Sequence, residues 1–173
     1  MESDLSEILT DHAYCEQKAA SNAISLIVQY PEYSDLVTAM TEIVQEEMSH
    51  FRQVHDLILA RGWKLGYERK DDYVNQLQKF MKKDGSRTEK LVERLLFAAM
   101  IEARSCERFR LLSEQISDPE LAAFYRDLMV SEANHYTLFI GFARKYGDGI
   151  DVDNRWKAFL DYEASVIQQY GTT

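Results

Sequence analysis

The chain has 173 residues, a net charge of −9 and 46% hydrophobic residues, which together indicate one globular domain rather than a disordered chain. Its 7 glycines and 2 prolines are too few for a turn-rich β-sandwich or barrel. No apolar run of about 18 residues is present that could cross a membrane. The acidic balance argues against a general nucleic-acid-binding protein but leaves room for a local basic patch.

The first residues, MESDLSEILTDH, are acidic and amphipathic, whereas a signal peptide begins with basic residues and continues with an apolar stretch. We therefore expect a cytoplasmic protein with no membrane partner. The two cysteines, Cys15 and Cys106, are then expected to be reduced thiols, because disulfides persist mainly in oxidising compartments.

Apolar residues recur at helical spacing through nearly the whole chain. In chain order, this pattern predicts helices over residues 3–29, 32–61, 87–117, 119–146 and 153–169, with a short helix over 73–82 inside the connection 67–86. Pro31 separates the first two helices, and Asp118-Pro119 is typical of a helix start. The last helix is expected to pack through Trp156, Phe159, Leu160 and Ile167.

Four long helices with a long middle connection are typical of a four-helix bundle with a crossover. We therefore expect an all-α fold, a four-helix bundle with an extra C-terminal helix, and a single domain over residues 1–173, since no flexible linker interrupts the chain. The alternating four-and-three spacing of a bundle core can be followed on each long helix. The core positions are apolar except near the middle of each helix.

Each long helix carries one glutamate at these central core positions, and two of the helices carry a histidine three residues later. The residues are Glu16, Glu47, His50, Glu102, Glu132 and His135. Glutamates are almost never fully buried unless they are paired or bound to a cation, and four in one core would repel one another. Positions i and i+3 lie on one helix face, so each Glu-x-x-His pair aims at one point. This set is typical of di-iron or di-manganese carboxylate proteins.

The same residues repeat along the chain at a nearly constant offset. Glu16 and Glu102 are 86 residues apart, and the two Glu-x-x-His pairs are 85 residues apart. Glu107 is a rival to Glu102, because Cys106-Glu107 echoes Cys15-Glu16, but the offset favours Glu102. His12, one turn before Glu16, is either a histidine in contact with the metal ligands or an ordinary core histidine, and we interpret it as the latter.

The middle of the chain is basic although the whole chain is acidic. Residues 61–90 contain nine Lys or Arg and five Asp or Glu, with Trp63, Tyr67, Tyr73 and Phe80 among them. One interpretation is a solvated connection. The other is a docking surface for a polyanion, with aromatic rings that stack on bases.

Four segments resemble the MiaE family of ferritin-like di-iron tRNA hydroxylases. They are DHAYCEQKAAS at 11–21, RKDDYVN at 69–75, IEARSCERF at 101–109 and SEANHY at 131–136. The resemblance covers nearly the whole chain. It implies hydroxylation of the isopentenyl group of 2-methylthio-N6-isopentenyladenosine, the modified base beside the tRNA anticodon.

The resemblance also implies two iron ions held by the six residues named above, with Glu47 and Glu132 shared between the ions. It implies O2 as co-substrate and an external electron donor such as a ferredoxin or reductase, because the chain has no flavin or nicotinamide motif. It favours tRNA docking by the basic segment, for which the candidates are Lys64, Arg69, Lys70, Lys82, Lys83 and Arg87.

Two alternatives to a tRNA hydroxylase remain open from the residues alone. One is a ferritin-like ferroxidase, peroxidase or iron-handling protein, which would share the metal site but not the tRNA substrate. The other is a metal-free interaction bundle, which the cost of burying four glutamates disfavours.

Overall fold

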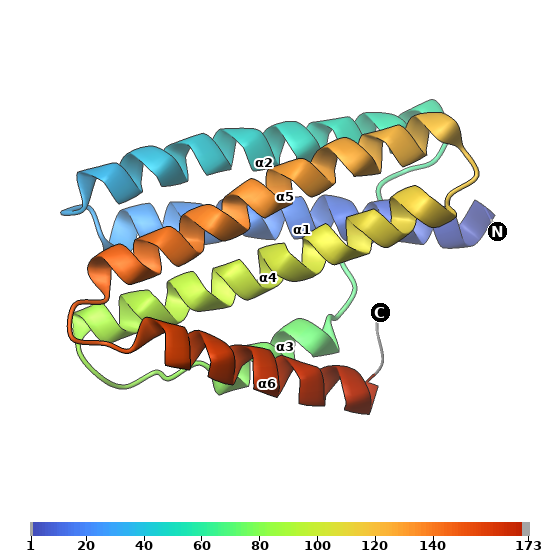
Figure 1. Cartoon of the computed structure of the whole chain (residues 1–173). Coiled ribbons are helices and arrows are strands. Elements are labelled where there is room, and N and C mark those ends of the chain that lie inside the picture. The colour runs from blue at the N-terminus through green and yellow to red at the C-terminus, as the bar shows by residue number, and fades with distance from the viewer. Residues whose placement is uncertain (1, 171–173) are drawn as a thin grey trace. The chain divides into compact units, whose positions relative to one another are not determined.

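The computed structural model describes the backbone of residues 2–170 and the side chains of residues 5–169. This part of the chain contains six helices and no strand, which confirms the expected all-α class (Figure 1). The helices are α1 (Glu2–Gln29), α2 (Ser34–Ala60), α3 (Asp72–Phe80), α4 (Arg87–Gln115), α5 (Pro119–Tyr146) and α6 (Val152–Tyr170). None of them has the length and apolar character needed to span a membrane. The chain divides into two compact units, Met1–Lys70 and Asp71–Thr173.

The first unit is a hairpin of α1 and α2, which pack against each other and are joined by a short turn. Gly62, with φ of 73°, ends α2 in the left-handed region, and residues 63–70 then return along α1. The Tyr14 hydroxyl on α1 donates to the carbonyl of Gly66 over 2.9 Å. Arg69 forms ion pairs with Glu7 and Asp11 on the same helix. We call residues 63–70 the connecting segment, and these contacts hold it against α1.

The second unit contains the α4–α5 hairpin, with α6 packed on α4 and α3 packed on α6. Ser86 and Glu89 form a capping box that begins α4. The Asp118 side chain caps α5, directly before Pro119, as the sequence predicts. These caps satisfy backbone N–H groups that helix termini otherwise leave unbonded, so they explain why both helices begin where they do.

A buried ion pair joins α4 to α6 in the second unit. Arg155 Nε lies 2.6 Å from Glu93 Oε1, and the Arg155 guanidinium also donates to the carbonyl of Phe80 over 3.0 Å. The same guanidinium lies over the ring of Phe80. This contact ties the end of α3 to both longer helices.

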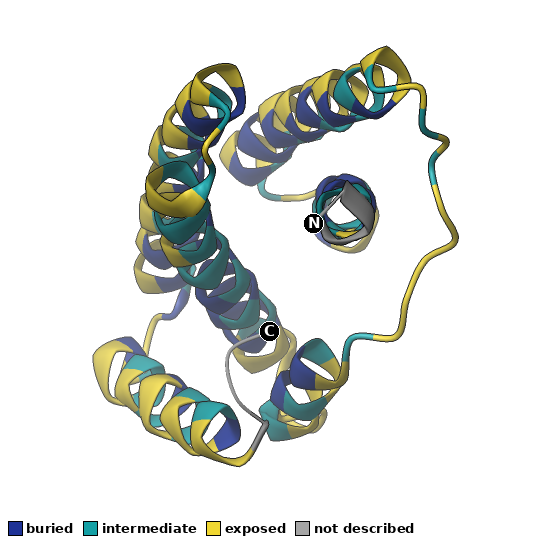
Figure 2. Ribbon diagram, turned by 90° about the vertical axis from the view of Figure 1, so that its right-hand side faces the viewer, coloured by how far each residue is buried: buried dark blue, intermediate teal, exposed yellow. Residues whose placement is uncertain are grey.

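Buried side chains follow one face of each long helix (Figure 2). All four central glutamates and both histidines of the Glu-x-x-His pairs are on these buried faces. The expectation that these six residues occupy core positions is therefore confirmed. The prediction for the last helix is wrong at Leu160, which is 43% exposed. Trp156 and Ile167 are half-buried. Phe159 is buried as expected, together with Val152 and Val166, which the sequence did not single out. They recur every seven residues along one stripe, and Leu160 lies one position beyond it.

Candidate metal centre

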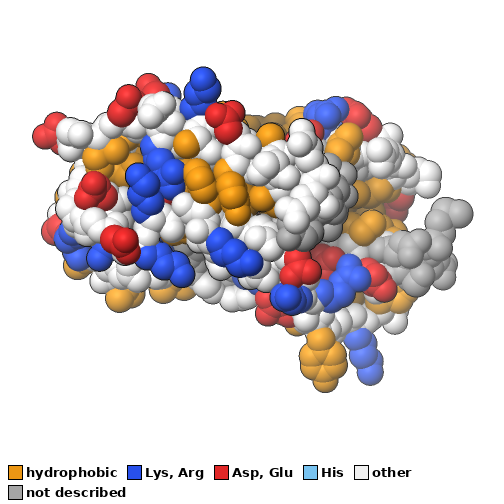
Figure 3. Space-filling model, turned by 90° about the horizontal axis from the view of Figure 1, so that it is seen from below, with side chains coloured by type: hydrophobic (Ala, Val, Ile, Leu, Met, Phe, Trp, Pro, Cys, Tyr) orange, Lys and Arg blue, Asp and Glu red, His pale blue; other side chains and the backbone are white. Residues whose placement is uncertain are grey.

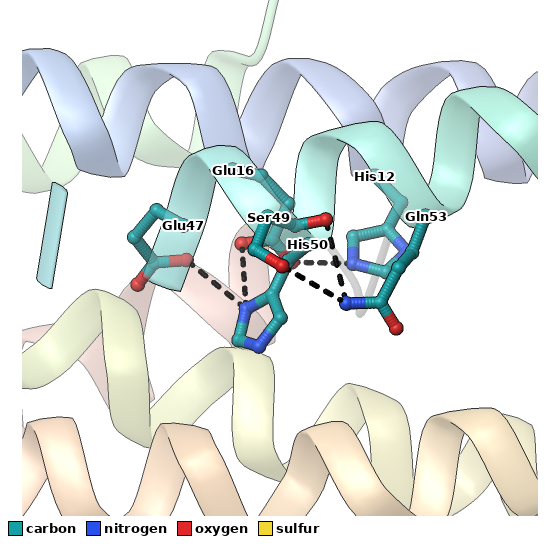
Figure 4. Close-up of polar contacts among 6 residues, drawn as sticks. All are labelled: His12, Glu16, Glu47, Ser49, His50 and Gln53. Atoms are coloured by element: carbon teal, nitrogen blue, oxygen red, sulfur yellow. Dashed lines mark hydrogen bonds and ion pairs between the residues drawn. The ribbon is translucent and has the colours of Figure 1, made fainter. Parts of the chain in front are cut away.

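The first unit brings three of the predicted ligands together (Figure 4). Glu16 comes from α1, and Glu47 and His50 come from α2. One ligand atom from each of the three lies within 4.8 Å of the other two, and all three residues are buried, at 3%, 0% and 8% exposure. Glu47 and His50 share a face because they are three residues apart on one helix. We call these three residues the first half-site.

The first half-site concentrates negative charge away from water. Burial and the neighbouring Glu47 raise the pKa of Glu16 well above its ordinary value, and His50 offsets part of that rise. Burial lowers the pKa of His50, but the contacts and charges of Glu16 and Glu47 outweigh it and raise that pKa to about 10. His50 Nδ1 lies 3.7 Å from Glu16 Oε2 and 3.5 Å from Glu47 Oε2. The two carboxylates thus favour a positive charge at this point.

A fourth residue contacts the first half-site from α1. His12 is 1% exposed, and its Nε2 lies 2.5 Å from Glu16 Oε1 (Figure 4). His12 is thus buried and hydrogen-bonded, as the interpretation as a core histidine expects, but its partner is one of the predicted metal ligands. Positions i and i+4 of a helix face the same side, so the spacing of His12 and Glu16 was the available signal, although it does not by itself distinguish a contact from adjacent packing.

The second unit carries the matching set. One ligand atom from each of Glu102 on α4 and Glu132 and His135 on α5 lies within 4.8 Å of the other two. The three residues are 3–4% exposed, and we call them the second half-site. The rival carboxylate, Glu107, is exposed and accepts from Arg104 over 2.8 Å. Its position on the outer face of α4 leaves Glu102 as the buried carboxylate of this helix segment.

Each half-site offers two carboxylates and one imidazole. Carboxylate oxygens and imidazole nitrogens are ligands that iron accepts, and buried carboxylates need a cation to remain ionised. The two half-sites therefore match a di-iron site in the number and kind of their donors.

The six basic residues predicted to dock RNA are all exposed. Lys64, Arg69 and Lys70 lie on the connecting segment, whereas Lys82, Lys83 and Arg87 lie where α4 begins. Arg69 differs from the others, because Glu7 and Asp11 of α1 hold its guanidinium. Charge counting along the sequence could not reveal this pairing, since the partners are about 60 residues away.

A helical hairpin that carries one glutamate and one Glu-x-x-His pair, present twice in one chain, defines the ferritin-like class of di-metal carboxylate proteins. The family model described as tRNA-(MS[2]IO[6]A)-hydroxylase (MiaE) matches residues 1–172. The chain belongs to the MiaE family. This membership confirms the expected class of enzyme, a tRNA-modifying hydroxylase, and does not favour the ferroxidase alternative.

Two curated relatives carry the name tRNA 2-(methylsulfanyl)-N(6)-isopentenyladenosine(37) hydroxylase. The protein from Pseudomonas putida is 40% identical over 165 residues, which cover 95% of this chain and 79% of that protein. The protein from Salmonella typhimurium is 28% identical, over 92% of this chain and 75% of its own length.

A solved structure is also similar to this chain. It is described as protein 43 with aldehyde deformylating oxygenase activity from Synechococcus, and it matches with a TM-score of 0.88 and 33% identity. The match covers 95% of this chain and 81% of that one. The expected ferritin-like fold is thereby confirmed.

Proposed function

We propose that this chain hydroxylates the isopentenyl group of 2-methylthio-N6-isopentenyladenosine beside the anticodon of tRNA. The observation that carries the proposal is the pair of buried Glu-Glu-His half-sites in a chain of the MiaE family. One oxygen atom of O2 enters a C–H bond of the isopentenyl group, and the other leaves as water. An external donor, such as a ferredoxin with its reductase, supplies two electrons, and two protons complete the balance.

Glu16, Glu47 and His50 hold one iron ion in this proposal, and Glu102, Glu132 and His135 hold the other. The bound iron pair supplies the activation of O2, which no amino-acid side chain performs. The surrounding protein fixes the carboxylates and imidazoles in place and excludes water from these donors, and the bound cations would keep the carboxylates ionised. Their low exposure, between 0% and 8%, supports this role.

The RNA substrate is proposed to dock on exposed basic residues. Lys64, Lys82 and Lys83 have no ion pair within the described part of the chain, so each is available to a phosphate. Lys70 and Arg87 complete the proposed set, whereas Arg69 mainly holds the connecting segment on α1. Basic side chains are interspersed with acidic and apolar ones on the face drawn in Figure 3. Exposed basic residues on the connecting segment and at the start of α4 reconcile an RNA substrate with a net charge of −9.

Tyr67 is proposed to stack on an unpaired base of the anticodon loop. Its side chain is 96% exposed, which is unusual for a large aromatic residue. The backbone on both sides is held, since Gly66 accepts from Tyr14 and Arg69 pairs with Asp11. A ring presented from a fixed backbone loses little freedom when a base stacks on it. Because the substrate is tRNA, we propose that the enzyme acts in the cytoplasm.

A product assay tests the proposed function. The chain is loaded with ferrous iron, oxidised, and mixed with peroxide and tRNA that carries the isopentenylated base, because peroxide replaces both O2 and the electron donor. Mass spectrometry of the digested tRNA should show one added oxygen on that nucleoside, only when iron is present. A long-chain aldehyde, offered as a second substrate because of the Synechococcus similarity, should remain unchanged. An altered aldehyde with unaltered tRNA would contradict the proposal.

A further inference from the structure

We infer that His12 is a positioning residue that fixes the Glu16 carboxylate for one of the two iron ions, and that the internal repeat places no such histidine one turn before Glu102. The inference rests on the proposed function, because it takes the half-sites to be iron sites. It concerns a residue outside the six proposed ligands.

The two oxygens of Glu16 have different surroundings. Oε1 lies 2.5 Å from His12 Nε2, whereas Oε2 lies on the side of His50, 3.7 Å from its Nδ1. An ionised carboxylate only accepts hydrogen bonds, so His12 donates from Nε2 whenever Glu16 is ionised to bind a metal ion. The bond occupies Oε1 and leaves Oε2 directed toward the other residues of the first half-site (Figure 4). Glu16 is therefore prepared to bind a metal ion through Oε2.

The hydrogen bond between His12 and Glu16 is strong, and the helix backbone fixes its geometry. Hydrogen bonds to a carboxylate are about twice as strong as those between neutral groups, and this one is buried, with both side chains at 4% exposure or less. His12 and Glu16 are four residues apart on α1, so the helix backbone fixes their separation. Partners of this kind orient metal ligands, and their removal lowers metal affinity by about 10- to 100-fold.

The internal repeat does not include His12, because no histidine occupies the corresponding position in the second half-site. The offset of 86 that relates Glu16 to Glu102 places Ala98 at the position that corresponds to His12. Ala98 is buried, at 5% exposure, and its methyl group cannot donate a hydrogen bond. A substitution at His12 therefore acts on the carboxylate of the first half-site alone, whereas a substitution at any proposed ligand acts on metal binding directly.

Anaerobic titration of the full chain with ferrous iron tests this inference. His12→Phe keeps a ring and removes the donor, and His12→Leu is a second variant without the donor. His12→Gln places a side-chain N–H at a similar reach and should restore binding. His55→Phe is the matched control, because His55 is half-buried on α2 and stacks on Phe51.

Calorimetry of the wild-type chain should resolve two binding events. In His12→Phe and His12→Leu, one event should weaken by about 10- to 100-fold and the other by less than about 3-fold, while circular dichroism shows an intact helical fold. Mössbauer spectra of the same samples should show a change in one of the two ferrous signals. His12→Gln should recover most of the lost affinity, and His55→Phe should match the wild type.

Two results would overturn the inference. One is an unchanged titration in both donor-less variants, and the other is an equal weakening of both events. Failure of the proposed function is distinguishable: a wild-type chain that binds no iron defeats the metal centre itself, and a chain that binds two irons without hydroxylating tRNA defeats only the substrate.

Discussion

Glu93 of α4 and Arg155 of α6 form a buried ion pair, with 2.6 Å between Arg155 Nε and Glu93 Oε1. Glu93 also accepts from the backbone N–H of Lys82 over 2.9 Å, so the carboxylate joins three segments of the second unit. The Arg155 side chain is 14% exposed and the Glu93 side chain 6%. Removing the cation alone would leave a buried carboxylate without its counter-charge.

Arg155→Met should therefore lower the free energy of unfolding by about 3–5 kcal/mol. The matched control is Arg144→Met, because Arg144 pairs with Asp153 of α6 at a surface where both side chains are more than half exposed. That loss should stay below about 1 kcal/mol. Urea denaturation measures both variants, and equal losses would show that the Glu93–Arg155 pair has no special structural role.

Iron stoichiometry separates the proposed ligands from other acidic residues. Glu132→Ala should reduce the iron bound per chain from two to one or none, because Glu132 is buried beside Glu102 and His135. Glu107→Ala should retain both ions, since Glu107 is exposed and pairs with Arg104. Colorimetric iron analysis of the purified variants provides the measurement. Two bound irons in Glu132→Ala would remove Glu132 from the ligand set.

RNA affinity tests the proposed base-stacking residue. Tyr67→Ala should weaken binding of an anticodon stem-loop by about 1–3 kcal/mol, whereas Tyr67→Phe, which keeps the ring, should bind like the wild type. Fluorescence anisotropy with labelled RNA measures both. If the alanine variant binds as tightly as the phenylalanine variant, Tyr67 does not stack on the substrate.

The salt dependence of RNA binding tests the proposed phosphate contacts. The double variant Lys82→Ala/Lys83→Ala should bind RNA more weakly and show a salt slope smaller by roughly one for each lost contact. Lys157→Ala is the control, because Lys157 is an exposed lysine of α6 with no ion pair within the described residues. An unchanged slope in the double variant would place the RNA elsewhere.

The raised pKa of Tyr73 should make the free energy of unfolding of the second unit depend on pH. Burial, the charge of Glu163 and the hydrogen bond that Tyr73 donates to it over 2.9 Å raise the pKa of Tyr73 well above its ordinary value. The folded chain then keeps a proton that the unfolded chain releases above about pH 10, so this contribution is complete below that pH and is lost as the pH rises further. Urea denaturation between pH 8 and pH 11 should show the advantage of the wild type over Tyr73→Phe shrinking above about pH 10. A constant difference would contradict the pKa shift.

The sequence predicted most of the fold because helical periodicity and helix caps are local signals. The short helix expected over 73–82 is α3, at Asp72–Phe80, and Asp71 caps it by accepting from the backbone N–H of Val74. The error at Leu160 arose because apolar character alone does not give the direction of a side chain. Which stripe of α6 is buried depends on the helices it packs against, and these are distant in the sequence.

The candidate site was predictable to the extent that its residues follow a repeat. The spacing identified four of the buried glutamates, Glu16, Glu47, Glu102 and Glu132, with His50 and His135, and it favoured the buried Glu102 over the exposed Glu107. It could not assign the contact of His12 with Glu16, which depends on side-chain conformation. Nor could it find the Glu93–Arg155 pair, whose members are 62 residues apart and belong to no repeat.

Turnover with isotopically labelled O2 tests the central claim most directly. The iron-loaded chain, a ferredoxin and reductase as the electron donor, and tRNA carrying 2-methylthio-N6-isopentenyladenosine are incubated under labelled O2, and the nucleosides are then analysed by mass spectrometry. We predict a hydroxylated nucleoside whose added oxygen carries the label, with no product from the Glu132→Ala variant. A hydroxylated nucleoside without the label, or the same yield from that variant, would contradict an oxygenase reaction at the two half-sites.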